Sequence, residues 1–151
     1  MKKFLILSLL PLFFVSGFAQ SYNEEKTALT NFLKRMYENA PFEGVRVVDD
    51  YDHTYLLSVL SLDTSKQPNE SAMNRVASVK AMSQASRFFN GSNITSDMII
   101  RTSEKSDGSG DTEIIETIKE NSVGYVKALE QLTNFKGKEG WQVFIFYKKI
   151  E

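Results

Sequence analysis

The segment WQVFIFYKKI, residues 141–150, is the strongest strand signal in the chain and decides the fold. Aromatic and β-branched side chains fill it, as is typical of a half-buried or buried strand. One face of this strand would present Trp141, Val143, Ile145 and Tyr147, and the other Phe144 and Phe146. Two apolar faces fit either a central strand that is covered on both sides or a strand with one exposed, partner-binding face. In the second case, Trp141 and Tyr147 form the candidate interaction surface.

The sequence just before this strand supplies its neighbour. Residues 136–140, KGKEG, have the composition of a hairpin turn, and a turn of this length joins antiparallel strands. The preceding residues 124–135 fit a helix by the spacing of Tyr125, Leu129 and Leu132, and they also fit a strand. The hairpin favours the strand.

A row of alanines marks the main helix that should cover the sheet. Asn69 or Ser71 would cap a helix that runs to Asn90, with Gly91 as a left-handed cap. Its inner face would carry Met73, Ala77, Ala81, Ala85 and Phe88. Because each alanine stops at Cβ, this stripe predicts close packing of the helix against a sheet.

The remaining elements complete the fold class. A capping box at Ser21 to Glu24 opens an amphipathic helix over residues 21–39, and residues 45–49 and 54–62 form a hairpin around residues 50–53. Residues 94–101 predict a strand that buries Ile94, Met98 and Ile100, and residues 114–118 a short helix. We therefore expect an α+β fold, with an antiparallel sheet and two long helices and one short helix packed on it.

The N-terminus has the layout of a secretory signal peptide. Lys2 and Lys3 precede an apolar run over residues 4–15, and Gly17 and Ala19 supply the small residues that a signal peptidase reads. The run is shorter than the roughly 20 apolar residues that span a bilayer. We expect a signal peptide over residues 1–19, cleavage between Ala19 and Gln20, and a single exported domain over residues 20–151, periplasmic or secreted.

Composition narrows the chemistry. Removal of Lys2 and Lys3 would leave 16 basic and 19 acidic residues. This slight excess of acidic residues does not favour binding to nucleic acid, which requires a clustered basic surface. The chain has no cysteine, so disulfides, thiolate catalysis and an acylated lipid anchor are excluded. The stability of the exported domain must come from packing.

One polar cluster is a candidate for chemistry. The only histidine, His53, follows Asp49, Asp50 and Asp52, and carboxylates beside an imidazole can bind a divalent metal or act as an acid–base pair. A solvated hairpin tip explains the same cluster. The loop DGSGD, residues 107–111, resembles the start of a calcium loop, but Thr112 stands where that loop needs glycine. We predict no catalytic residues, no cofactor and no metal site.

Three features stand together over residues 69–150: the helix VASVKAMSQASRFFNG, NSVG at residues 121–124, and the closing pair GYVKALEQLTNF and WQVFIFYKK. With these features, the stretch resembles the small bacterial envelope lipoproteins related to the N-terminal module of the flagellar protein FlgT. The resemblance implies an antiparallel sheet backed by helices and a non-catalytic envelope role, although this chain lacks the acylated cysteine. The expected function is that of an exported module that binds an envelope protein or a cell-wall component. The alternative is a small hydrolase or metal-dependent enzyme that uses residues 49–53.

Overall fold

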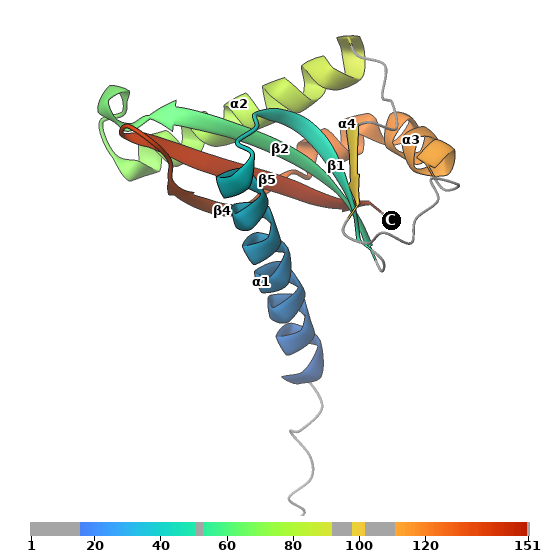
Figure 1. Cartoon of the computed structure of the whole chain (residues 1–151). Coiled ribbons are helices and arrows are strands. Elements are labelled where there is room, and N and C mark those ends of the chain that lie inside the picture. Colours follow the sequence, from blue (N-terminus) through green and yellow to red (C-terminus); the bar gives the residue numbers. More distant parts are fainter. Residues whose placement is uncertain (1–15, 51–52, 92–97, 102–110, 151) are drawn as a thin grey trace, which may run out of the picture. The chain divides into compact units, whose positions relative to one another are not determined.

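The computed structural model describes residues 16–50, 53–91, 98–101 and 111–150, and is shown in Figure 1. The chain divides into two compact units, residues 1–39 and residues 40–151. The first contains one described helix and the second contains a sheet with three helices.

The helix of the first unit is α1, Ser16–Asn39. The predicted helix over residues 21–39 is therefore confirmed, and it begins five residues earlier than its capping box suggested. The hydroxyl of Thr27 donates to the carbonyl of Asn23 at 2.7 Å, one turn back along the helix. In the described part of the chain, no helix combines the length and apolarity needed to cross a membrane.

The second unit is built on a five-stranded sheet in the order β3-β1-β2-β5-β4. The strands are β1 (Gly44–Asp50), β2 (His53–Asp63), β3 (Ile99–Arg101), β4 (Glu130–Lys136) and β5 (Trp141–Ile150). All neighbouring pairs are antiparallel except β1 and β3, which run parallel. The predicted α+β class with a mainly antiparallel sheet is confirmed.

Strand β5 has the bounds that the sequence predicted, and it has a neighbour on each side. It pairs with β2 from Thr54 opposite Ile150 to Asp63 opposite Trp141. Val143, Phe144 and Ile145 are fully buried, although successive residues point to opposite faces of the sheet. The double apolar pattern of residues 141–150 is thus that of an interior strand.

Helix α2, Glu70–Gly91, covers one face of the sheet. The Asn69 side chain caps it, because its Oδ1 accepts a hydrogen bond from the backbone N–H of Ala72 at 2.8 Å. The alanine stripe faces inward as predicted, and its three members have no exposed surface: Ala77, Ala81 and Ala85. They share one hydrophobic core with residues of β1, β2 and β5.

The end of α2 corrects one expectation. Gly91 belongs to the helix and its φ is not positive, whereas Gly44 and Gly140 do adopt a positive φ. The predicted left-handed cap at Gly91 is therefore wrong.

The stretch over residues 124–135 is divided between a helix and a strand. Helix α3, Asp111–Glu120, is followed by the short helix α4, Ser122–Lys127, and only then by β4. The strand prediction is right for residues 130–135 and wrong for residues 124–127, where Tyr125 is buried in the core from a helical turn. The described residues that follow β3 therefore form two short α-helices, where one was expected.

Strand β3 also departs from expectation. It is only three residues long and pairs in parallel with β1, with Ile99 opposite Val47. Ile99 is buried and Ile100 only half-buried, so the predicted phase, which buried Ile100, is wrong. Residues 94–97 of the predicted strand lie outside the described residues.

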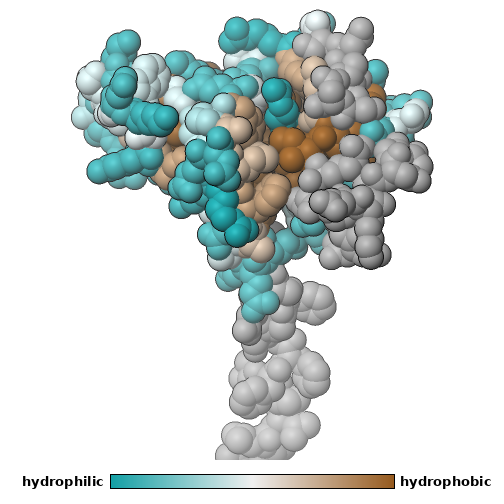
Figure 2. All heavy atoms as spheres, in the orientation of Figure 1, coloured by the Kyte–Doolittle hydropathy of each residue, from teal (hydrophilic) through white to brown (hydrophobic). Residues whose placement is uncertain are grey.

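The connection from β2 to α2 is polar. It contains the short 3-10 helix η1, Thr64–Lys66, none of whose residues is buried. In the view of Figure 2, hydrophilic side chains cover this end of the sheet unit.

Candidate functional site

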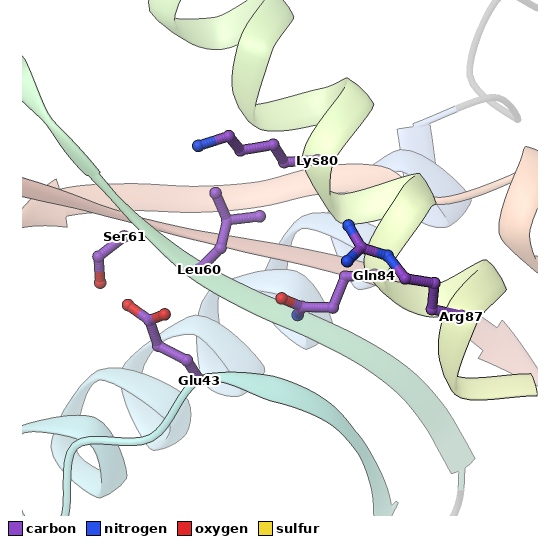
Figure 3. A pocket seen from close by; sticks show the side chains of 6 residues that line it. All are labelled: Glu43, Leu60, Ser61, Lys80, Gln84 and Arg87. Carbon is purple, nitrogen blue, oxygen red and sulfur yellow. The ribbon is translucent and has the colours of Figure 1, made fainter. Parts of the chain in front are cut away.

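A hollow of about 380 Å³ lies between α2 and β2. Three of its lining residues come from α2 and two from β2, and one immediately precedes β1: Lys80, Gln84, Arg87, Leu60, Ser61 and Glu43. Figure 3 shows the three side chains of α2 on one side of the hollow and Glu43 on the other, with β2 between them. All six residues belong to the sheet unit.

The central side chain of this pocket, Gln84, is held by β2. Its Nε2 donates to the carbonyl oxygen of Val59 at 3.0 Å and to Oγ of Ser58 at 3.1 Å. Ser58 is itself fully buried, and its hydroxyl donates to the carbonyl oxygen of Ala81 at 3.2 Å. The serine hydroxyl therefore acts as both donor and acceptor, and it links the strand to the helix at two points.

Two cationic side chains flank Gln84 along the helix. Lys80 precedes it by four residues and Arg87 follows it by three, so all three share one face of α2. Arg87 donates from one nitrogen to Oγ of Ser83 at 3.2 Å. Among the described residues, neither cation has a carboxylate within ion-pair distance. Both positive charges are thus available to a bound group.

Asp63, at the end of β2, has a carboxyl group whose acidity is changed by its neighbours. Its Oδ1 accepts hydrogen bonds from the hydroxyl of Ser65 at 2.7 Å and from the backbone N–H of Ser65 at 3.0 Å. These bonds, with a smaller contribution from Lys66 at 3.6 Å, hold the pKa of Asp63 below its ordinary value of 3.8. This carboxylate caps η1 and does not line the pocket.

The predicted polar cluster at residues 49–53 is divided by the sheet. Asp50 pairs with His53 and Asp49 with Thr54 across the β1–β2 hairpin. Because side chains alternate along a strand, Asp49 lies on the face opposite to Asp50 and His53. Asp49 accepts a hydrogen bond from the hydroxyl of Thr54 at 3.3 Å. The hairpin does not bring all these groups to one point, and Asp52 lies outside the described residues.

Metal-ligating groups do not converge elsewhere in the described part of the chain. No group of three or more His, Asp or Glu side chains within it is placed to hold a metal ion. Of the calcium-like loop at residues 107–111, only Asp111 is described, and it is the buried first residue of α3.

The candidate interaction surface on β5 is reduced to one residue. Trp141 is 43% exposed, whereas Tyr147 is 5% exposed and its ring packs at 6.2 Å from that of Tyr55. Trp141 and Tyr147 therefore do not form a continuous exposed surface.

Sequence reasoning missed the pocket between α2 and β2. The spacing of Lys80, Gln84 and Arg87 was visible as a polar stripe beside the alanine row. Their role depended on two facts that the spacing does not contain: the orientation of the Gln84 amide and the position of Glu43. Both come from the tertiary packing of α2 on β2.

Comparison with protein-family models gives no match to this chain. The curated proteins and the solved structures likewise give no significant match. The resemblance of residues 69–150 to envelope lipoproteins stays a prediction from the sequence.

Proposed function

We propose that this protein is an exported, non-catalytic module of the bacterial envelope, and that it binds an envelope protein or a cell-wall component through the pocket between α2 and β2. The signal-like residues 1–19 support export. The resemblance of residues 69–150 to envelope lipoproteins supports the location and the role.

The observation that carries the proposal is the construction of the pocket. Its volume of about 380 Å³ lies within the range of roughly 300–1,000 Å³ that is usual for small-ligand sites. Two cations without carboxylate partners among the described residues, Lys80 and Arg87, flank an amide that the sheet holds in one orientation. A preorganised polar group beside charges that are not already paired is suited to recognition.

The positions of Asp49, Asp50 and His53 favour binding over the alternative of hydrolysis or metal chemistry. A general base and its orienting carboxylate must lie within hydrogen-bond reach of each other. Asp49 and His53 lie on opposite faces of the sheet, and Asp50 and His53 sit at the end of the hairpin rather than in the pocket.

Two experiments test this function. Mass spectrometry of the exported protein should find Gln20 at the N-terminus, and recovery of only the intact 17.2 kDa precursor would refute export. In a pull-down from envelope extract, a component captured by the wild-type protein should be lost with a Lys80→Gln/Arg87→Gln double variant. Arg75→Gln, an exposed cation of the same helix outside this pocket, is the matched control and should keep the component. Equal capture by all three proteins would show that the pocket is not the binding site.

A further inference from the structure

The amide of Gln84 presents an acceptor to the pocket. Both hydrogens of Nε2 are donated to groups of β2, one to the Val59 carbonyl and one to Oγ of Ser58. Exchange of the amide oxygen and nitrogen would set Oε1 against the Val59 carbonyl oxygen, acceptor against acceptor, so the orientation is fixed by chemistry. The atom of Gln84 that stays available to a ligand is therefore Oε1.

The opposite side of the pocket adds a second acceptor. Glu43 is exposed and precedes β1, and Figure 3 shows its carboxylate directed toward β2. Among the described residues, no lysine or arginine lies within ion-pair distance of it. Glu43 on one side of the pocket and Gln84 Oε1 on the α2 side are both acceptors, and each requires an N–H donor.

The two cations of α2, Lys80 and Arg87, supply N–H donors to the pocket. Lys80 and Arg87 are seven residues apart on α2, which separates their Cα atoms by about 10 Å along the helix axis. A ligand that carried only negative charge would satisfy these cations but would face Glu43 and the Gln84 oxygen. A ligand that carried only positive charge would meet the reverse conflict, and such unpaired contacts oppose binding.

Building on the proposed function, we propose that the pocket recognises a small zwitterionic, peptide-like ligand, with its carboxylate at Lys80 and Arg87 and its ammonium group at Gln84 Oε1 and Glu43. The cations and the two acceptors then each receive a complementary group. An extended dipeptide is about 7 Å long, and a hollow of about 380 Å³ can hold one. Arg87 keeps free guanidinium donors for a carboxylate, in the paired geometry that arginine favours.

The test uses the full chain, purified after export, and the dipeptide alanylglycine with both ends free. Isothermal titration should show saturable binding. N-acetyl-alanylglycine lacks the ammonium group and alanylglycine amide lacks the carboxylate, so each should bind about tenfold more weakly or worse. The side-chain amide signal of Gln84 should shift in the NMR spectrum when the free dipeptide is added.

Three variants assign the two ends of the ligand. Lys80→Gln and Arg87→Gln should each weaken the binding of the free dipeptide about tenfold and leave the roughly tenfold penalty for acetylation unchanged. Glu43→Gln should weaken it while making the acetylated peptide nearly equivalent to the free one. All three side chains are exposed, so the variants should fold, and Arg75→Gln is the control with unchanged affinity.

The outcomes separate this inference from the proposed function. If the acetylated and free dipeptides bind equally well, or if inorganic phosphate binds better than either, the pocket is an anion site and the zwitterion is refuted. If no dipeptide binds at millimolar concentration, the ligand class is refuted. In both cases the pull-down from envelope extract decides on the proposed function. If the Lys80→Gln/Arg87→Gln variant loses the captured component, the proposed function stands. If that variant keeps the component, the proposed function is refuted.

Discussion

The hydroxyl of Ser58 in β2 donates a hydrogen bond to the main-chain carbonyl of Ala81 in α2, at 3.2 Å. The same hydroxyl accepts from Gln84, so one buried serine joins the middle of the strand to two positions on the helix. An apolar residue at this position could not accept the hydrogen bond from the amide of Gln84. The link between Ser58 and Ala81 therefore sets both the position of α2 and the polarity of the pocket.

Loss of this hydroxyl should be costly. Ser58→Ala should lower the free energy of unfolding by about 1–3 kcal/mol, because Gln84 Nε2 then loses one of its acceptors in a partly buried site. Urea denaturation measures the change, with the exposed Ser71→Ala as a control expected within about 0.5 kcal/mol of wild type. A double-mutant cycle combines Ser58→Ala with Gln84→Ala. The losses of unfolding free energy in the two single variants should add up to more than the loss in the double variant. Strict additivity would mean that the hydrogen bond between these side chains contributes nothing.

The close packing of the alanine stripe predicts that a larger side chain there destabilises the protein. Ala81 has no exposed surface, so Ala81→Leu should destabilise the protein by about 1–3 kcal/mol through overpacking of α2 against the sheet. On the same helix Val79 is 68% exposed, and Val79→Leu should change the stability by less than about 0.5 kcal/mol. The two denaturation midpoints are compared directly, and equal midpoints would contradict the inward orientation of the stripe.

Two glycines should respond to alanine in opposite directions. Gly140 has a φ of +80°, a left-handed conformation that costs an alanine about 1–2 kcal/mol, so Gly140→Ala should destabilise the β4–β5 turn. Gly124 lies in α4 with open space around the position of an added Cβ, and Gly124→Ala should stabilise the protein by up to about 1 kcal/mol. Thermal denaturation distinguishes the signs. A stabilising Gly140→Ala change would show that the turn can relax.

The lowered pKa of the Asp63 carboxyl predicts how the stability of the protein changes at acid pH. Its pKa in the folded state is held below the ordinary value, so its ionised form contributes stability at neutral pH. That contribution is lost as the pH falls from about 4 through the folded-state pKa. Ser65→Ala should raise the pKa of Asp63 more than Lys66→Gln does, because the hydroxyl hydrogen bond is the largest cause of the shift. A carbon NMR titration of the Asp63 carboxyl measures both changes, and the reverse order would place the cause in the ion pair.

The hairpin carboxylates should not bind metal. Because Asp49 lies across the sheet from His53, zinc or manganese should leave the melting temperature unshifted, and His53→Ala should change the stability by less than about 1 kcal/mol. Differential scanning calorimetry with and without a chelator is the measurement. A saturable, metal-dependent rise that disappears in His53→Ala would revive the enzyme alternative.

The elements that the sequence predicted well are those that carry their own long pattern. Residues 141–150 are rich in aromatic and β-branched side chains over a full strand, and the apolar stripe from Met73 to Phe88 repeats over about four turns, so strand β5 and helix α2 followed with few errors. The predictions for the short elements α4 and β3 were wrong, because such short patterns fit both the helical and the strand period. Tyr125 enters the core from a single helical turn, and β3 has only three residues, so neither period nor phase could be established.

The candidate site could be predicted only in part. The residues of the polar cluster, Asp49, Asp50 and His53, were named from the sequence, whereas Lys80, Gln84 and Arg87 were not, although their spacing places them on one helix face. The hydrogen bonds that turn Oε1 of Gln84 outward join residues 25 and 26 positions apart. Such contacts depend on which strand lies under the helix, and that information is not contained in a local pattern.

The pairing of β5 with β2 has a consequence for the order in which the molecule forms. The interior of the sheet joins residues 54–63 to residues 141–150, so its hydrogen bonds close a loop that contains most of the second unit. Contacts between such distant segments form slowly, since the entropy of closing the loop is lost before the contacts are gained. The sheet cannot be completed until β5, Trp141–Ile150, is available. A chain truncated before Trp141 would lack the strand that lies between β2 and β4. Completion of the sheet therefore depends on residues 141–150, and a chain without them would leave one edge of β2 unpaired.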